Sequence, residues 1–211
     1  MKLIIWDLDG VIIDSVEVVK KFMTDIFNQY GKDPSGLKDL KHGNINDFYN
    51  EFLKTPSENQ KEISIEKFTE LVRTHPMNKI CDEMVKKETL DFIKETYKEG
   101  YIHAIATNTR HERVHKGVKN LEIEHLFKYI ISSCDVEEPK PAPDMILKIL
   151  EELDIKPEEA IFVDDSDEAI KAGIEAGTKT LLLTNKIEDI DGSIKEKITL
   201  ITNDIKDLKK I

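Results

Sequence analysis

The sequence predicts an α/β fold, in which a doubly wound, parallel, Rossmann-like sheet carries one inserted small α-helical domain. Six short runs of consecutive apolar residues predict strands that are buried on both faces, as strands of parallel sheets are. These runs cover residues 3–6, 102–106, 129–131, 161–163, 180–183 and 198–201. From about residue 83 onward they alternate with segments of helical hydrophobic periodicity, which is typical of a doubly wound sheet.

A different pattern fills the chain between the first and the second predicted strand. Polar and apolar residues recur there at helical spacing and predict helices at 15–30, 45–53, 57–60 and 65–75. A connection of this length is too long and too regular for a crossover loop. We therefore expect an α/β core domain, built from residues 1–14 and 83–211, and a helical domain at residues 15–82.

Composition limits the classes of protein and partner that fit this chain. The chain has 211 residues, of which 39% are hydrophobic, so it can bury a substantial core. No apolar stretch approaches the ~18 residues of a membrane span, so we expect no membrane partner. The formal net charge of −11 argues against a nucleic-acid partner, because phosphate backbones bind basic surfaces. Cys81 and Cys134 form no CxxC motif, which favours a reducing, cytoplasmic location.

Polar residues follow four of the predicted strands, at or just beyond the point where each strand ends. These residues are Asp7 and Asp9, Thr107 and Asn108, Lys140, and Asp164 and Asp165. Taken alone, each group is also typical of turns, helix caps or charged linkers. In an open α/β sheet, however, the carboxyl ends of the strands meet at one edge, where ligands bind. The convergence of these polar residues at one edge therefore predicts a functional site.

The residue types at this edge favour phosphoryl-transfer chemistry. Several carboxylates cannot all stay ionised together without a cation, and Mg²⁺ suits an open site with oxygen ligands. Lys140 adds a positive charge, and Thr107 adds a hydroxyl donor. Asp7 and Asp9 can then divide the work, one attacking phosphorus and the other transferring the proton of the leaving group.

At these residues the chain resembles the haloacid dehalogenase-like hydrolase superfamily. It looks most like its phosphatases with a helical cap inserted after the first strand, the group of phosphoglycolate phosphatase and β-phosphoglucomutase. The four segments that carry the resemblance are residues 7–15, 107–108, 140–144 and 164–166. They occur in the expected order, and the helical insertion, residues 15–82, falls in the expected place.

The resemblance implies a role for each residue of the site. Asp7 would be the nucleophile that forms an aspartyl-phosphate, and Asp9 the general acid and base. The residues that bind phosphate would be Thr107, Asn108 and Lys140. The Mg²⁺ ligands would be Asp7, the backbone carbonyl of Asp9, Asp164 and Asp165. The helical domain would act as a cap that closes over the substrate and supplies specificity.

We therefore expect a Mg²⁺-dependent phosphatase that hydrolyses a phosphate monoester of a small metabolite, as a monomer or small homo-oligomer. An acid at Asp9 favours an oxygen leaving group over a halide. A phosphomutase is the first alternative, although similar mutases carry a histidine where this chain has Val19 and Lys20. Phosphonate cleavage through a cap lysine, Lys20 or Lys21, is the second. A non-catalytic module that accepts or binds phosphate is the third, and it would not need Asp9.

Five further residues are candidates for substrate contact. They are Lys41, His42, Asn44 and Asn46 in a loop of the helical domain, and Arg110 after the second motif. The loop is equally typical of a connection between helices, with Asn46 as the N-cap of the next one. Arg110 is equally typical of a surface residue at the start of a helix.

Overall fold

The computed structural model describes residues 2–40, 45–55, 63–75, 80 and 82–211. The chain divides into two compact units, Met1–Ile13 with Ile80–Ile211, and Asp14–Lys79. Each unit is described by itself. The catalytic role expected for the first and the cap role expected for the second stay predictions.

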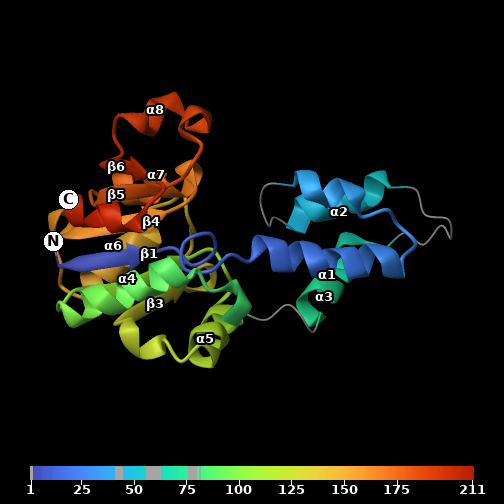
Figure 1. Cartoon of the computed structure of the whole chain (residues 1–211), viewed down its shortest axis with the longest axis horizontal. Coiled ribbons are helices and arrows are strands. Elements are labelled where there is room, and N and C mark those ends of the chain that lie inside the picture. The colour runs from blue at the N-terminus through green and yellow to red at the C-terminus, as the bar shows by residue number, and fades with distance from the viewer. Residues whose placement is uncertain (1, 41–44, 56–62, 76–79, 81) are drawn as a thin grey trace. The chain divides into compact units, whose positions relative to one another are not determined.

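The first unit contains one six-stranded parallel sheet, as the apolar runs predict. The strand order is β3-β2-β1-β4-β5-β6. The bounds are β1 (Leu3–Trp6), β2 (Ile102–Thr107), β3 (Tyr129–Ser132), β4 (Ala160–Asp164), β5 (Lys179–Leu183) and β6 (Leu200–Thr202). β1 lies in the middle and pairs with both β2 and β4. Because β1, β2 and β4 are parallel neighbours, their carboxyl ends lie side by side (Figure 1).

Helices cover both faces of this sheet, which makes the fold Rossmann-like and confirms the predicted class. The helices of the first unit are α4 (Lys87–Lys98), α5 (His111–Asn120), α6 (Asp144–Glu152), α7 (Asp167–Glu175) and α8 (Gly192–Lys195). Leu3 and Ile5 of β1 pack in one core cluster with residues of α6 and α7. Trp6 contacts Phe92 of α4, the helix in front of the sheet in Figure 1. Strands buried on both faces are the reason for the continuous apolar runs.

The second unit is helical, as its periodicity predicts. It contains α1 (Val16–Gln29), the short 3₁₀ helix η1 (Ser35–Asp39), α2 (Ile45–Lys54) and α3 (Ile65–Thr74). The helix expected at 57–60 lies outside the described residues. Aromatic side chains fill its core, with Phe27 and Phe68 packed against Phe52 at ring-centroid distances of 5.3 and 5.2 Å. This cluster gives the insertion a hydrophobic core of its own.

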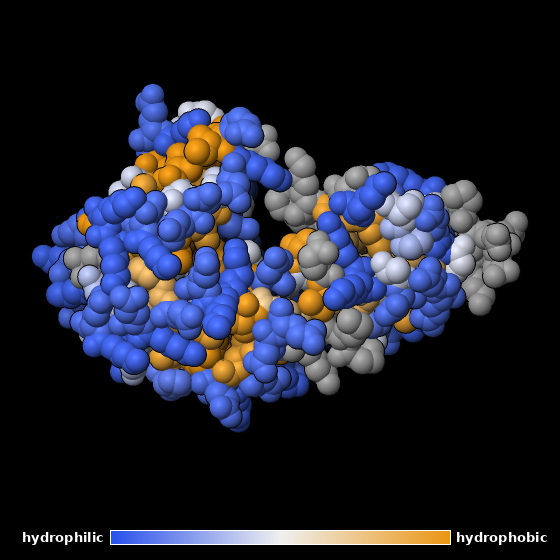
Figure 2. Space-filling model, viewed as in Figure 1, coloured by the Kyte–Doolittle hydropathy of each residue, from blue (hydrophilic) through white to orange (hydrophobic). Residues whose placement is uncertain are grey.

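The surface agrees with the composition of the chain. Hydrophilic residues cover most of the face in Figure 2, and 35% of all residues are charged. Within the part of the chain that the structure describes, no helix is both long and apolar enough to span a bilayer.

Candidate active site

The site begins where β1, β2 and β4 end. Asp7 directly follows β1, and its backbone N–H donates to the carbonyl oxygen of Val163 at 2.8 Å, which continues the ladder between β1 and β4. Thr107 is the last residue of β2, and Asp164 is the last residue of β4. Lys140 lies in the segment between β3 and α6. Parallel pairing therefore brings together residues that lie far apart in the sequence.

Lys140 joins two carboxylates in the interior of this edge. Its Nζ donates to Asp7 Oδ1 at 2.6 Å and to Asp164 Oδ2 at 2.7 Å. All three side chains are almost fully buried, with 6%, 6% and 1% of Lys140, Asp7 and Asp164 exposed. Charge-assisted hydrogen bonds of this kind are short and strong in a low-dielectric interior. The lysine thus fixes the position of the Asp7 carboxylate.

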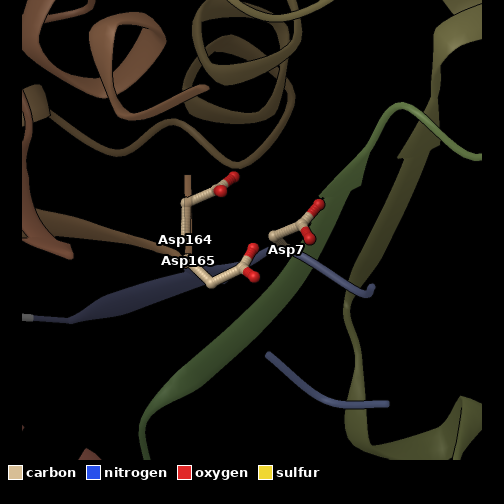
Figure 3. A group of neighbouring side chains, drawn as sticks. All are labelled: Asp7, Asp164 and Asp165. Carbon is tan, nitrogen blue, oxygen red and sulfur yellow. The ribbon is translucent and has the colours of Figure 1, made fainter. Parts of the chain in front are cut away.

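A third carboxylate completes an acidic cluster at the same point. Oxygen atoms of Asp7, Asp164 and Asp165 all lie within 4.8 Å of one another. Figure 3 shows Asp7 beyond the end of β1, beside Asp164 and Asp165 at the end of β4. Three carboxylates are a donor set that suits a hard cation such as Mg²⁺. The Asp9 carboxylate is not part of this set, and its expected contribution through the backbone carbonyl stays a prediction.

One lysine does not balance three acids, and the pKa values reflect this. Burial raises the pKa of Asp7 well above its usual value, and the Asp164 charge adds to the rise, while Lys140 opposes it. The pKa of Asp165 is raised to about 6 by burial and by the Asp164 charge. A divalent cation among these oxygens would remove this excess of negative charge.

A tight turn after β1 positions Asp9. The backbone N–H groups of Ile12 and Ile13 both donate to the carbonyl oxygen of Leu8 at 2.9 Å. The Asp9 carboxylate accepts a hydrogen bond from the hydroxyl of Thr109, which lies two residues beyond β2. The sequence alone does not predict Thr109 as a site residue. The only indication of it in the sequence is its position two residues after Thr107, near the end of the same strand. If Asp9 is the general acid, as predicted, Thr109 would be the residue that positions it.

Thr109→Val should lower kcat for phosphate release roughly ten-fold and leave KM nearly unchanged, because one hydrogen bond that orients Asp9 is lost. Thr109→Ser keeps the hydroxyl and should retain most of the activity. Steady-state kinetics of both variants check this. An unchanged kcat in Thr109→Val, or a larger loss in Thr109→Ser than in Thr109→Val, would contradict the role given to this hydrogen bond.

Thr107 and Asn108 shape the loop after β2. The Thr107 side chain is buried, and its Oγ1 accepts from the backbone N–H of Thr109 at 3.2 Å. The Asn108 side chain donates from Nδ2 to the carbonyl oxygen of Lys140 at 2.9 Å. This bond ties the loop to the segment that carries the buried lysine. The phosphate contacts predicted for both residues stay predictions.

Gly10 and Lys86 bring further elements to the site. Gly10 has φ +90°, and a Cβ at this position would overlap the Asp165 carboxylate. Lys86, at the N-terminus of α4, donates from Nζ to the carbonyl oxygen of Gly10 at 2.6 Å. Its charge opposes the rise in the pKa of Asp165. Nothing in the local sequence around Lys86 indicated this contact, which depends on the packing of α4 against the loop after β1.

Gly10→Ala should weaken Mg²⁺ binding, because the new methyl group displaces the Asp165 carboxylate. Gly100 provides a matched control, since it has φ +91° and nothing within 4 Å of an added Cβ. Both alanine variants should lose about 1 kcal/mol of stability through the left-handed backbone. Only Gly10→Ala should raise the Mg²⁺ concentration needed for half-maximal activity. The same metal requirement in both variants would contradict the role given to Asp165.

Of the remaining predicted contact residues, the structure describes Arg110 and Asn46. Arg110 is the exposed N-cap residue of α5, and its side chain makes no hydrogen bond or ion pair to the described residues. Asn46 is exposed in the first turn of α2, in the second unit, so it follows the N-terminus of that helix rather than capping it. Lys41, His42 and Asn44 lie outside the described residues.

The fold and the acidic site define a class of α/β hydrolase whose site suits phosphoryl transfer. The family model for haloacid dehalogenase-like hydrolases matches residues 4–183. Pyrophosphatase PpaX of Bacillus cereus is 31% identical to this chain over 179 residues, which cover 84% of this chain and 80% of that protein. The corresponding protein of Bacillus mycoides is 29% identical over 183 residues, 86% of this chain and 82% of that protein. This chain belongs to the haloacid dehalogenase-like hydrolase family and is a hydrolase of the phosphatase type.

Solved structures confirm the fold. A protein assigned as a β-phosphoglucomutase from Thermotoga maritima matches with a TM-score of 0.82 at 18% identity, covering 100% of both chains. A predicted phosphoglycolate phosphatase from Haemophilus somnus matches with a TM-score of 0.80 at 20% identity, covering 100% of this chain and 97% of that one. CbbY from Rhodobacter sphaeroides, solved with phosphate, gives a TM-score of 0.70 at 21% identity, covering 95% and 93%.

Proposed function

We propose that this protein is a Mg²⁺-dependent phosphatase that hydrolyses a phosphate monoester of a small metabolite through an aspartyl-phosphate. The observation that supports this most directly is the buried Lys140 bridge between Asp7 and Asp164, beside the Asp165 carboxylate. It combines one oriented carboxylate, one fixed cation and a set of oxygen ligands. These are the parts that a nucleophilic attack on a phosphate group requires.

The first half of the proposed reaction forms the intermediate. An Asp7 carboxylate oxygen forms a bond to phosphorus, and the bond between phosphorus and the leaving oxygen breaks. Asp9, held by Thr109, gives its proton to that oxygen, so that an alcohol leaves. Lys140 keeps Asp7 oriented and balances the negative charge of the phosphoryl group. Mg²⁺, when bound by Asp7, Asp9, Asp164 and Asp165, would supply further positive charge there.

The second half releases the product. Asp9, now ionised, takes a proton from a water molecule, and the water oxygen attacks phosphorus. The bond between phosphorus and the Asp7 oxygen breaks, which frees inorganic phosphate and restores the Asp7 carboxylate. Asp9 thereby regains the proton that it gave away. No further reactant is needed, so the cycle is balanced.

The other parts of the proposal concern selection of the substrate. We assign residues 1–14 and 83–211 to catalysis, and residues 15–82 to a cap that selects the substrate. The cap residues that would contact the substrate are Lys41, His42, Asn44 and Asn46. Arg110 of the catalytic domain would contact it as well. The phosphate group of the substrate is bound by Thr107, Asn108 and Lys140. The protein works in the cytoplasm as a monomer or small homo-oligomer.

Inorganic pyrophosphate is a second candidate substrate, because the relatives in Bacillus cereus and Bacillus mycoides are named pyrophosphatases. The chemistry at Asp7 would be the same, with a phosphate group in place of the alcohol as the leaving group. A broad panel of phosphate compounds tests both candidates. It should contain p-nitrophenyl phosphate, sugar phosphates, phosphoglycolate and pyrophosphate, each with Mg²⁺ and with EDTA.

We expect Mg²⁺-dependent release of phosphate from at least one monoester in this panel. A kcat/KM for pyrophosphate far above that for every monoester would favour the second candidate. An isomerised sugar phosphate as the product would indicate a mutase, and an aldehyde formed from a phosphonate would indicate a phosphonate hydrolase. A stable phosphorylated Asp7 without turnover would indicate a non-catalytic phosphate acceptor. No release from any compound would refute the proposal.

A further inference from the structure

A polar pocket lies at the carboxyl edge of the sheet, beyond β5 and β6. Its volume is about 360 Å³. Three segments line it: residues 86–89 at the start of α4, residues 183–185 at the end of β5 and after it, and Asn203 with Ile205 after β6. None of these residues belongs to the carboxylate cluster, and all lie in the first compact unit. The mechanism above gives this pocket no role.

The charges around the pocket favour an anion. Lys86 and Lys87 line it together with one acid, Glu88, which leaves an excess of one positive charge. The pocket also receives the N-terminus of α4, a helix of 12 residues whose N-cap residue makes no side-chain cap hydrogen bond. The free N–H groups and the helix dipole of such a first turn attract negative charge.

The side chain of Thr89 provides an independent indication of a ligand. Thr89 lines the pocket and is only 3% exposed, and its side chain makes no hydrogen bond to any residue that the structure describes. A hydroxyl without a protein partner, on a side chain that is otherwise nearly buried, is free to bond to a bound group or to water in the pocket. The Thr184 hydroxyl also lines the pocket and accepts from the backbone N–H of Lys186 at 3.1 Å, which leaves its own proton to donate.

We propose that this pocket binds a phosphate group, at a site separate from the carboxylate cluster. Ammonium groups, backbone N–H groups, hydroxyls and the amides of Asn185 and Asn203 offer the many donors that a tetrahedral oxyanion takes up. Lys86 connects the two sites, because its Nζ also donates to the carbonyl oxygen of Gly10 at 2.6 Å. The bound phosphate is either free inorganic phosphate or a second phosphate group of a substrate held at Asp7.

Titration of the full chain with inorganic phosphate in EDTA tests the site without any turnover. Saturable shifts in ¹H–¹⁵N spectra should appear at the amides of Lys87, Glu88 and Thr89. Lys87→Met removes one charge, and Thr89→Val removes the hydroxyl with little change of volume. Each should raise the dissociation constant for phosphate roughly three-fold or more. Lys98→Met, at the exposed C-terminal end of the same helix, should bind like the wild type.

A wild-type protein whose α4 amides do not shift, or a site whose affinity is unchanged in both variants, would overturn the proposal. A second titration separates the two sources of phosphate. It uses the Asp7→Asn variant with Mg²⁺, and compares 1,6-hexanediol bisphosphate with hexyl phosphate and inorganic phosphate. Bisphosphate binding about ten-fold tighter than either indicates one molecule that spans both sites. Equal affinities assign the pocket to free phosphate. Neither readout requires hydrolysis, so a failed phosphatase assay leaves this test intact.

Discussion

Asp7→Asn should abolish phosphate release, with a loss in kcat on the order of 10⁴-fold or more, because an amide cannot form the aspartyl-phosphate. The fold should survive. The Asp7 carboxylate is buried, and its pKa is raised by that burial, so its charged form is costly to keep. In the variant, Lys140 would still pair with Asp164 at 2.7 Å, which leaves one cation and one anion. The metal-free variant should therefore be at least as stable as the wild type.

The measurement is steady-state phosphate release, together with denaturant unfolding in EDTA. Asp91→Asn is the matched control, since Asp91 is an exposed carboxylate on α4 without a described partner. It should leave both rate and stability unchanged. An Asp7→Asn variant that folds and turns over substrate like the wild type would remove Asp7 as the nucleophile. Loss of activity together with loss of the fold would leave the rate uninformative, and an Asp7→Glu variant would then be needed to separate nucleophile position from stability.

Lys140→Met should have the largest effect on stability. The substitution leaves Asp7 and Asp164 buried without their cation, which costs about 3–5 kcal/mol in comparable buried pairs. Activity should fall as well, because the orientation of Asp7 and the charge that balances the phosphoryl group are both lost. Lys119→Met, an exposed lysine on α5 without a described partner, is the control.

Two conditions should restore part of this stability. Acid should help, because a group whose pKa is raised in the folded state binds protons more tightly there than in the unfolded chain. Its contribution is therefore greatest at low pH and is lost as the pH rises through the raised pKa of Asp7. Mg²⁺ should help at neutral pH, because it supplies a cation to the same oxygens. A destabilisation that depends on neither pH nor Mg²⁺ would indicate lost packing, and not an uncompensated charge.

Several features of the fold could be predicted because they depend on short-range patterns. Strands buried on both faces require apolar side chains at successive positions, so β1 and β4 were recognisable from their composition. The helices of the second unit could be predicted because apolar residues recur there with a period of about 3.6 residues, which the aromatic core of this unit requires. The carboxylates were recognisable because parallel strands end at one edge, where polar residues are otherwise unexpected.

Other features depend on contacts between distant segments, and no local pattern encodes them. Thr109 reaches Asp9 across 100 positions of the sequence, and Lys86 reaches Gly10 across 76. Thr89 lies on the buried face of α4, at a position that the helical period alone would assign to ordinary packing. Only the pocket beside it indicates that its hydroxyl could contact a ligand. The Asn108 side chain bonds to the Lys140 carbonyl oxygen across 32 positions, another contact that no local pattern indicates.

The sequence by itself determined the class of fold, the helical insertion and the residue types that converge on the edge of the sheet. These properties follow from hydrophobic periodicity, which is local, and from the alternation of strands and helices along the chain, which requires parallel strands. Only the tertiary structure decided which groups pair there: Lys140 with Asp7 and Asp164, Thr109 with Asp9, and Lys86 with Gly10. Hydrogen bonds and ion pairs require atoms within about 3 Å of each other, and such distances are set by the packing of the whole domain.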